Sequence, residues 1–504
     1  MVRRPRAAVP RFVLALAVAF TATAAQAQPL FTNAFPPEEF AAHREKLMAA
    51  IGDGVAVLQG AAETGTYVAF RQNNHFYYLT GVEVPRAIVV VDGKAKTTTL
   101  FLPPRDERWE RAEGPILVPG DEAARLTGIA SVLPRDEFAA AVEALGRDGR
   151  TIYTPHRGES LAEATVDSVL RHERLSQADP WDGRSSREAI FIAKLKAKAP
   201  QARIADLDPI VDRLRLVKTP REIAAIREAT RVSMLGILEG MKTARPGIKE
   251  RDIAAVANFE FTRNGALNPA YFALVAAGTN AHYPHYHASQ STLRDGDFVL
   301  FDYAPDIDYY TSDVTRMFPA NGHFTPWQRE AYTVYLRCYR ALMSELKPGR
   351  TARQVFDAAS VKMQAVLAGT TFTDPKIEEA AKRFVALFGP DRHGTRVGHF
   401  VGMEVHDVDP DGDAGDVLAP GMVLTIEPAL TIPDDRVYIR LEDMILVTAT
   451  GHENLSESLP YEIADIEAAM KAPGIDERAA PAARPAKPAH PPVSTPRSQE
   501  PQQP

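Results

Sequence analysis

The chain has 504 residues, of which 45% are hydrophobic and 24% charged, and its 58 basic and 65 acidic residues give a formal net charge of −7 at pH 7. A chain of this length exceeds the size at which one hydrophobic core usually stops growing, so we expect two folded domains with appendages. The acidic balance, with no basic block in the body of the chain, argues against nucleic acid or an anionic membrane as the main partner and favours a small molecule or a peptide.

Residues 1–27 have the pattern of a secretory signal. Arginines at the start of the chain precede the apolar run FVLALAVAF (12–20), and Ala25-Gln26-Ala27 forms an A-x-A cleavage site. We therefore expect a signal peptide that is removed after Ala27, and a periplasmic or secreted mature protein that makes no contact with the membrane. An uncleaved anchor is the alternative, although the apolar run is short for a bilayer span.

The segment from residue 35 to about 205 alternates apolar runs with helical patterns. GVAVLQG (54–60), RAIVVVDG (86–93) and TTTLFLPP (97–104) are typical of strands, whereas DEFAAAVEAL (136–145) is typical of a helix. Strands that alternate with helices predict an α/β domain.

A second domain is expected from about residue 215 to 470. Thr219, Pro220 and Glu222 form a strong helix start, with a capping threonine, a proline in the first turn and a capping-box glutamate. The segment TPWQREAYTVYLRCYRALM (325–343) repeats this pattern. Because long helices interleave here with hairpin-like strands, we expect an α+β domain.

The cysteine content limits how the chain can be stabilised. Cys338 is the only cysteine, so no intramolecular disulfide can form even though export permits such bonds. It lies in the helical pattern 325–343, and we expect a buried, unreactive side chain there. Stability must then come from packing and from any bound metal ion.

The segment FDYAPDIDYYTSDVTR (301–316) carries aspartates within strand-like flanks, where aspartate is unfavourable. If the flanks pair as antiparallel strands about a turn near Pro305–Asp308, Asp302 lies opposite Asp313. Two carboxylates that face each other across a ladder repel, so either one is protonated or a cation lies between them. The alternative is a different register, with both side chains in solvent.

Further ligand-type side chains follow later in the chain: His399, His406, Glu427 and Glu442. The glutamates interrupt apolar runs, where an ionised carboxylate is costly unless it is paired or bound to metal. Each residue alone is more often a satisfied polar group than a ligand. Together with the two aspartates they gather four carboxylates and imidazole nitrogen, and four negative charges balance two divalent ions. We therefore expect two divalent metal ions, with manganese preferred and zinc or cobalt as alternatives.

The end of the chain has a different composition. From residue 472 it is rich in Pro, Ala and polar residues and has no periodic apolar positions. Such a segment cannot bury enough apolar surface to offset chain entropy, so residues 472–504 are expected to be disordered.

Six segments together resemble the pita-bread metallopeptidases, and among them the aminopeptidase P (Xaa-Pro aminopeptidase) group. They are FRQNNHFYYLTGV (70–82), VAAGTNAHYPHYH (275–287), FDYAPDIDYYTSDVTRMFPANGHFT (301–325), GHFVGMEVHDV (398–408), GMVLTIEPAL (421–430) and IRLEDMILVT (439–448). The resemblance covers roughly residues 35–470, and the ordered set is far more specific than any single motif. It implies a C-terminal α+β pita-bread catalytic domain, preceded by an α/β domain. It also implies a metal-dependent hydrolase that releases the N-terminal residue from peptides with proline in the second position.

Carried over position by position, the resemblance implies five metal ligands: Asp302, Asp313, His399, Glu427 and Glu442. In this pattern Asp313 and Glu442 bridge the two ions. Asp302 completes the ligands of one ion, and His399 with Glu427 completes those of the other.

The resemblance also implies catalytic roles for side chains around the ligands. His285 and His406 match histidines that contact the substrate and stabilise the tetrahedral intermediate. Arg440 matches an arginine that orients the carboxylates, a support that metal ligands generally need. Glu427 would carry the proton from the attacking hydroxide to the leaving nitrogen. Because that nitrogen belongs to a proline ring, a dedicated proline pocket is expected.

Several positions depart from the family pattern. Pro305 and Ala429 stand where the family usually has glycine, and Thr431 stands where an aromatic residue is common. His393, which is also assigned to substrate binding, lies six residues before His399 instead of four. No departure removes a ligand, so the differences concern the expected subsites rather than the metal centre.

Three other functions share parts of this pattern. Xaa-Pro dipeptidase (prolidase) has the same ligands and differs in how the site closes around a free carboxylate, and methionine aminopeptidase usually lacks a long N-terminal domain. From another class, an exported metal-free peptide-binding protein of the same fold would lack the complete ligand set. The segment 70–82 and the long N-terminal domain favour the aminopeptidase. The sequence is also compatible with a homo-oligomer.

Overall fold

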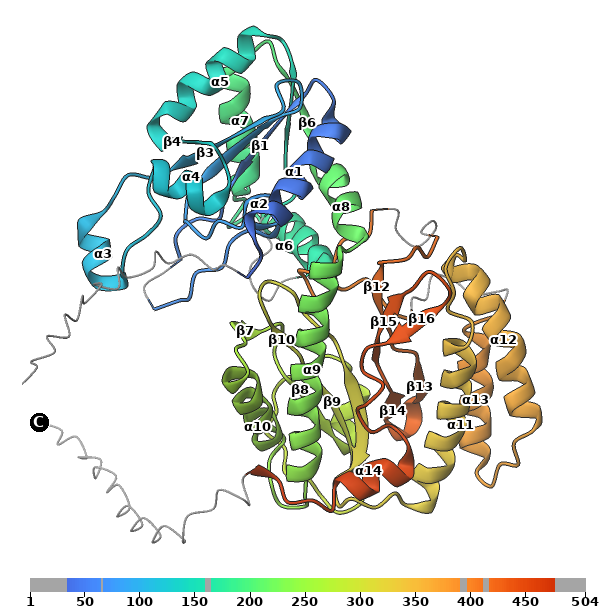
Figure 1. Cartoon of the computed structure of the whole chain (residues 1–504). Coiled ribbons are helices and arrows are strands. Elements are labelled where there is room, and N and C mark those ends of the chain that lie inside the picture. Colours follow the sequence, from blue (N-terminus) through green and yellow to red (C-terminus); the bar gives the residue numbers. More distant parts are fainter. Residues whose placement is uncertain (1–33, 65–66, 159–164, 390–396, 411–416, 476–504) are drawn as a thin grey trace, which may run out of the picture.

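The computed structural model describes residues 34–64, 67–158, 165–389, 397–410 and 417–475 (Figure 1). The predicted signal segment 1–27, His393 and residues 476–504 of the predicted tail lie outside these ranges.

A six-stranded mixed sheet forms the centre of the N-terminal part. Its strands are β1 (Val55–Gln59), β2 (Ile88–Asp92), β3 (Thr97–Leu102), β4 (Ser131–Pro134), β5 (Thr151–Thr154) and β6 (Arg203–Asp206). They lie in the order β4-β3-β2-β1-β5-β6. β1 pairs antiparallel with β2 and parallel with β5, and β3 pairs parallel with β4. The three apolar runs predicted as strands are β1, β2 and β3.

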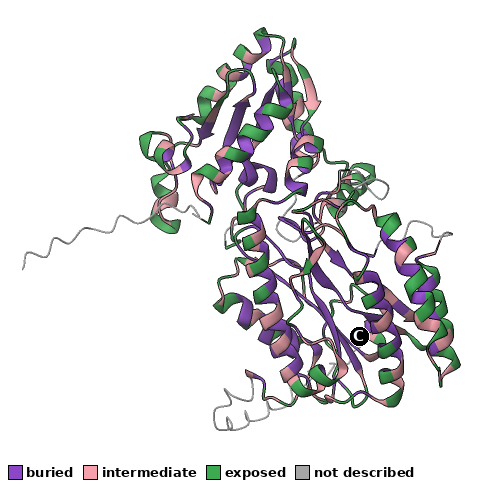
Figure 2. Ribbon diagram, turned by 45° about the vertical axis from the view of Figure 1, so that its right-hand side comes forward, coloured by how far each residue is buried: buried purple, intermediate pink, exposed green. Residues whose placement is uncertain are grey.

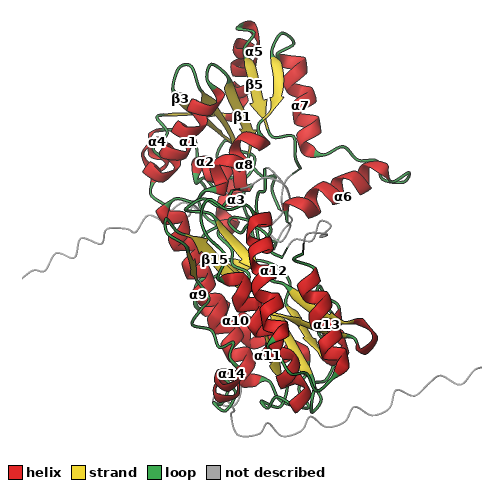
Figure 3. Ribbon diagram, turned by 90° about the vertical axis from the view of Figure 1, so that its right-hand side faces the viewer, coloured by secondary structure: helices red, strands yellow, loops and turns green. Residues whose placement is uncertain are grey.

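Helices cover both faces of this sheet: α1 (Pro37–Ile51), α2 (Asn74–Thr80) and α4 (Asp121–Thr127) on one, and α5 (Phe138–Arg147) and α7 (Arg187–Lys198) on the other. Two further helices, α3 (Glu107–Glu113) and α6 (Val166–Ala178), lie away from the sheet (Figure 3). Because successive strand residues point to opposite faces, Val55 and Val57 of β1 pack with side chains of α5 and α7. Ala56 and Leu58 belong to the core on the other side, together with residues of α1 and α2.

The C-terminal part follows α8 (Asp208–Leu216) and consists of two helical layers with strands between them (Figure 1). One helical layer contains α9 (Pro220–Thr243) and α10 (Glu250–Arg263), and the other contains α11 (Pro326–Met343), α12 (Ala352–Ala368) and α13 (Pro375–Ala386). The short helix α14 (Ile463–Ala469) ends the described part and contacts α9. The strands are mostly buried and the outer helix faces are exposed (Figure 2).

Small antiparallel sheets make up the strand layer. One has the order β11-β9-β8, from β8 (Leu274–Ala277), β9 (Phe298–Asp302) and β11 (Thr315–Pro319), and another pairs β7 (Asn268–Pro269) with β10 (Pro305–Asp306). The second half contributes β12 (Val423–Ile426), β15 (Asp443–Val447) and β16 (His452–Asn454), and the pair β13 (Ala429–Ile432) and β14 (Val437–Arg440). The described residues therefore have the predicted fold class, an α/β part followed by an α+β part.

Local sequence chemistry explains where the two longest helices begin. Thr219 accepts a hydrogen bond from the Glu222 amide, and the Glu222 side chain accepts one from the Thr219 amide. The same reciprocal capping box starts α11 at Thr325. Both predicted helix starts are thus confirmed. Cys338 lies in α11 and is fully buried, as predicted.

The two parts share one continuous core. Buried residues of α1, α2 and the N-terminal sheet belong to the same apolar cluster as those of α9, α11 and the C-terminal strands. At the junction the Tyr77 and Tyr309 rings stack with centroids 3.6 Å apart, and Arg71 Nε donates to Asp306 Oδ2 at 2.7 Å. The N-terminal part therefore packs directly on the segment that carries the aspartates.

None of the helices in the described ranges is long and apolar enough to span a bilayer.

Candidate metal centre and active site

The hairpin between β9 and β11 carries the two aspartates in a register different from the predicted one. Asp302 pairs with Thr315, not with Asp313. The turn lies at Asp308 and Tyr309, whose φ values are 53° and 72°, and the flanking residues Ile307 and Tyr310 exchange backbone hydrogen bonds. Two successive residues with positive φ make a tight two-residue turn. The observed turn, Ile307–Tyr310, therefore lies two residues later than the predicted Pro305–Asp308.

The two aspartates nevertheless converge. The correction moves the pairing by two residues, and side chains two residues apart on a strand point to the same face. Asp302 and Asp313 are 3% and 5% exposed, so the alternative with both side chains in solvent is wrong. The hydroxyl of Tyr271 lies 2.5 Å from Asp302 Oδ1 and 2.7 Å from Asp313 Oδ1.

The two glutamates lie opposite each other in a second, longer hairpin. Ile426 pairs with Asp443 and Ala429 pairs with Arg440, so the same register places Glu427 across from Glu442. The regular ladder is interrupted between these pairs, where Pro428 has no amide hydrogen to donate.

Tyr335 of α11 fills the interruption. Its hydroxyl donates to Pro428 O at 2.7 Å and accepts from Leu441 N at 2.8 Å. The side chain is fully buried. The hydroxyl thus satisfies the backbone groups that flank the two glutamates.

His399 brings an imidazole to the carboxylates. Its Nδ1 lies 3.2 Å from Phe400 O. Because a carbonyl can only accept, Nδ1 donates to it, and Nε2 is the ring nitrogen that faces the carboxylates. Nε2 lies 3.4 Å from Asp313 Oδ2, 3.5 Å from Glu427 Oε1 and 3.9 Å from Glu442 Oε1. Nε2 is therefore the nitrogen that can bind a metal ion at this site.

Arg440 is the buried cation of the cluster. Its Nη2 donates to Asp302 Oδ2 and to Thr315 Oγ1 (2.9 Å), and its Nη1 donates to Glu427 Oε2 at 3.0 Å. Thr315 in turn donates to Glu442 Oε2 at 2.7 Å. Arg440 therefore has the orienting position implied by the resemblance.

The five predicted ligands form two overlapping groups that share Glu442. Single ligand atoms of Asp302, Asp313 and Glu442 lie within 4.8 Å of one another, and so do those of His399, Glu427 and Glu442. Burial raises the pKa of Asp313 and Glu442 well above the ordinary range, and the neighbouring carboxylates add to the effect.

The donor set fits divalent cations. Glu442 Oε1 is buried and has no hydrogen-bond partner, which is costly unless a cation binds it. Four carboxylates and Arg440 carry a net charge of −3, which becomes +1 with two divalent ions and zero with one hydroxide. Carboxylate oxygens with one imidazole suit hard or borderline ions.

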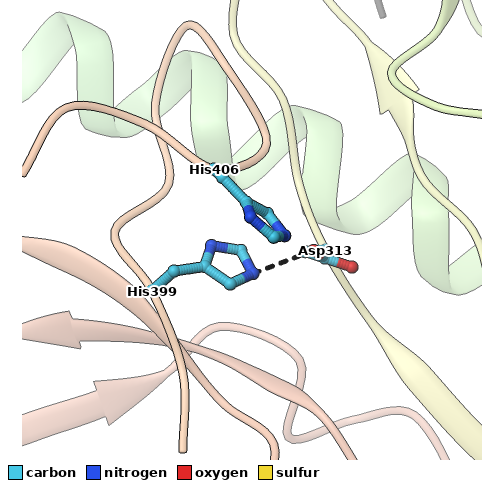
Figure 4. A group of neighbouring side chains, drawn as sticks. All are labelled: Asp313, His399 and His406. Atoms are coloured by element: carbon cyan, nitrogen blue, oxygen red, sulfur yellow. Dashed lines mark ion pairs between the residues drawn. The ribbon is translucent and has the colours of Figure 1, made fainter. Parts of the chain in front are cut away.

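The structure brings His406 to this cluster but not His285. The His406 and His399 ring centroids are 3.9 Å apart, and both rings lie next to Asp313 (Figure 4). His285 is exposed in the loop after the short helix Gly278–His282, and it is not among the residues that line the pocket described below. Its role as a substrate contact stays a prediction, as does that of His393.

A cavity of about 570 Å³ opens over the His399, His406 and Glu427 side of the cluster, within the usual size range of ligand pockets. Apolar side chains form much of its wall: Val166, Leu170, Phe384, Leu387, Phe388 and Val397. Leu170 belongs to α6, which lies at the junction of the two parts (Figure 3). The N-terminal part therefore contributes to the wall of the site.

Sequence reasoning did not identify Tyr271, Thr315 or Tyr335. Tyr271 lies 31 residues before Asp302, and Tyr335 lies in a helix 93 residues from its carbonyl partner. A tyrosine in an apolar pattern gives no local sign of such contacts. Thr315 could have been found only with the correct hairpin register.

Comparison with known proteins agrees with this geometry. Residues 40–153 match the family described as aminopeptidase P, N-terminal domain, and residues 224–449 match metallopeptidase family M24. The chain is 32% identical over 460 residues to Xaa-Pro aminopeptidase of Escherichia coli K12. The match covers 86% of this chain and 98% of the E. coli protein.

Solved structures with a similar fold include the aminopeptidase PepP of Pseudomonas aeruginosa. It is 30% identical, has a TM-score of 0.68 and covers 87% of this chain and 98% of its own. Aminopeptidase P from E. coli with the inhibitor Pro-Leu is 28% identical, has a TM-score of 0.70 and covers the same shares. These similarities confirm the predicted pita-bread fold with its additional N-terminal domain. The chain belongs to metallopeptidase family M24, in the Xaa-Pro aminopeptidase group that carries the aminopeptidase P N-terminal domain.

Proposed function

We propose that the chain is a dinuclear metallopeptidase that releases the N-terminal residue from peptides with proline in the second position. One observation carries the proposal: two overlapping donor groups that share Glu442 lie at the pocket. They occur in a chain that matches 98% of the length of the Xaa-Pro aminopeptidase from E. coli.

The proposed ligands are the members of the two donor groups. Asp302, Asp313, His399, Glu427 and Glu442 would together hold two divalent ions, and Glu442 belongs to both groups. When bound, the ions would supply Lewis acidity that makes hydroxide available from water near neutral pH. We propose manganese, with zinc and cobalt as alternatives, because oxygen-rich donor sets suit these ions.

Residues of the chain would handle the proton and the developing charge. Glu427 borders the pocket and its Oε2 accepts from Arg440, which leaves Oε1 facing His399. In this position Glu427 can take a proton from the attacking water and pass it to the leaving nitrogen. His406 also borders the pocket and can donate to the oxyanion that forms at the scissile carbonyl.

The apolar wall supports binding of a proline-containing peptide. Phe384, Phe388 and Leu170 offer ring and aliphatic surface next to the polar centre, the combination that most ligand pockets have. The dipeptide Pro-Leu, which inhibits the E. coli relative, begins with proline and corresponds to the leaving part of an Xaa-Pro-Leu substrate.

A comparison of three peptides tests the proposal. The metal-loaded chain should cleave the first bond of an Xaa-Pro-Xaa tripeptide, and both the Xaa-Pro dipeptide and an Xaa-Ala-Xaa tripeptide should be much poorer substrates. Preferred cleavage of the dipeptide would instead identify a prolidase. A protein with no stoichiometric divalent metal and no cleavage of any of the three would be the peptide-binding alternative.

We further propose that the mature protein is exported. The support is the signal pattern in residues 1–27. N-terminal sequencing of protein recovered from the periplasm or medium should begin at Gln28. The proposed folded units, 35–205 and 215–470, would follow in that mature chain.

A further inference from the structure

The loop that carries His406 has no regular secondary structure of its own. Residues 401–408 form neither helix nor strand, and the Asp407 amide donates to Phe400 O at 2.8 Å to close the loop at its base. A few backbone hydrogen bonds attach the loop to other segments, among them Thr311 N to Gly402 O at 2.8 Å. The buried side chains of the loop supply its remaining anchors.

Both acidic residues that flank His406 bind the same guanidinium. Glu404 and Asp407 are 4% and 6% exposed. Arg215, at the end of α8, donates from Nη2 to Glu404 Oε2 and to Asp407 Oδ1 (2.5 Å), and Lys218 Nζ donates to Asp407 Oδ2 at 3.1 Å. Buried carboxylates are strongly unfavourable without such partners. Arg215 thus holds the loop on both sides of His406.

Arg215 is held in turn by the N-terminal part. Its Nη1 lies 3.0 Å from His75 Nδ1. The other ring nitrogen, His75 Nε2, lies 3.4 Å from both Asp208 Oδ1 and Asp212 Oδ1. The Arg215 side chain is only 2% exposed, so this arrangement excludes solvent.

A second contact from the N-terminal part supports the same loop. Arg71 Nη2 and Asn74 Nδ2 both donate to Met403 O, at 3.2 Å and 3.3 Å. The N-terminal part therefore reaches the loop in two ways: side chains of Arg71 and Asn74 bind the loop backbone, and His75 contacts Arg215, which binds the loop side chains.

We propose that Arg215 is a positioning residue for His406, and that through it the N-terminal part of the chain sets the geometry of the catalytic centre. Arg215 lies between the residues matched by the two families, 40–153 and 224–449. The inference rests on the proposed function, because it concerns the proposed role of His406 in that reaction.

Substitution of Arg215 by lysine separates charge from geometry. Lysine keeps the positive charge, but its single ammonium cannot meet His75 and both carboxylates at once, as the two terminal nitrogens of the guanidinium do. At least one of these contacts is then lost and the loop shifts. A displacement of about 1 Å in a catalytic group can cost about 10²-fold in rate.

The test is a double-mutant cycle in the metal-loaded full chain. Arg215→Lys is made in the wild-type and in the His406→Ala background, and kcat, KM and metal content are measured with an Xaa-Pro-Xaa peptide. We expect Arg215→Lys to lower kcat about 10- to 100-fold in the wild-type background, with metal content unchanged. In the His406→Ala background it should lower kcat by less than about threefold, because residues that act together are not additive.

Two further variants complete the design. Glu404→Gln leaves Arg215 in place and should show the same coupling to His406, so the test does not depend on Arg215→Lys folding. Arg150→Lys is the matched control, since Arg150 forms a two-point ion pair with Asp92 in the N-terminal sheet, away from the site. It should leave kcat within about twofold.

The outcomes are distinguishable. Equal loss of kcat in both backgrounds, or no loss in either, would contradict the positioning role of Arg215 and leave the proposed function intact. A wild-type chain that cleaves no Xaa-Pro peptide would contradict the proposed function, and this inference with it.

Discussion

Replacement of Tyr335 by phenylalanine would remove the hydroxyl that fills the gap in the long hairpin, between the β12–β15 pairing and the β13–β14 pairing. That hydroxyl bridges Pro428 O and Leu441 N, the backbone groups next to Glu427 and Glu442. The substitution leaves the ring and its packing in place, so it isolates the hydrogen bonds.

The expected magnitude follows from the groups left without a partner. One buried carbonyl and one buried amide lose their hydrogen bonds, and each unsatisfied group costs about 1–3 kcal/mol. The removed hydroxyl no longer needs to be desolvated, which offsets part of the loss. We expect the free energy of unfolding to fall by about 2–4 kcal/mol. If the strands close to pair directly, Glu427 and Glu442 are displaced and metal affinity should fall about 10-fold.

Urea unfolding of the metal-loaded protein and a competition titration with a chelator would measure the two effects. Tyr332→Phe is a suitable control, because the Tyr332 hydroxyl also donates to a backbone carbonyl, that of Tyr461, but is remote from the two glutamates. Tyr332→Phe should reduce stability without a change in metal affinity. Unchanged stability and unchanged metal affinity in Tyr335→Phe would refute the proposed bridge.

Three further predictions concern the site, and a fourth concerns the core around Cys338. Asp313→Asn or Glu442→Gln should each lower metal-dependent turnover by at least about 10²-fold while circular dichroism stays the same, and near-normal turnover would contradict the ligand assignment. His406→Ala should lower kcat by about 10²-fold with metal content unchanged, and loss of metal would instead identify a ligand. Burial and the neighbouring carboxylates raise the pKa of Asp313 and Glu442, so the folded metal-free protein binds more protons than the unfolded chain, and its stability should fall as pH rises above the ordinary values of 3.8 and 4.5. The metal-free Asp313→Asn variant should show a weaker pH dependence in chemical denaturation, and an equal dependence would contradict the cause given. Burial raises the pKa of Cys338 to about 12, so a thiol reagent at pH 8 should label it only after unfolding, and rapid labelling of the folded protein would contradict the packing described.

Features that depend on neighbouring residues in the chain were predictable from sequence. The starts of α9 and α11 follow from capping threonines, prolines and polar third residues, all within four positions. The strands β1, β2 and β3 follow from short apolar runs between turn residues. The residues that cap these helices or bound these strands are neighbours in the chain, so the sequence shows them directly.

The predicted register of the β9–β11 hairpin was wrong because contacts with residues far away in the chain fix its turn. Asp308 and Tyr309 adopt positive φ, yet the Asp-Tyr pair is not one of the usual turn sequences. Tyr309 is held by Tyr77, which stacks on its ring, and by Arg71, whose guanidinium lies 4.5 Å from the ring centroid. Both partners lie more than 200 residues away in the chain, so no local pattern indicates the turn.

The metal cluster was predictable in outline from carboxylates that interrupt apolar runs, and the resemblance to a family was needed to assign the ligands. The resemblance selected the five residues that the structure gathers in two overlapping donor groups. It did not indicate the ion pairs of Arg215, because Glu404 and Asp407 lie 189 and 192 residues from it. Long-range charge pairing has no signature in a single sequence, and it was found only in the folded chain.

The metal stoichiometry of the active protein tests the central claim most directly. Elemental analysis of purified chain, titrated with manganese while cleavage of an Xaa-Pro-Xaa peptide is followed, should give two bound ions per chain at full activity. Asp313→Asn, which removes a proposed ligand, should retain fewer than two ions and little activity. Full activity with one ion or none would contradict the account.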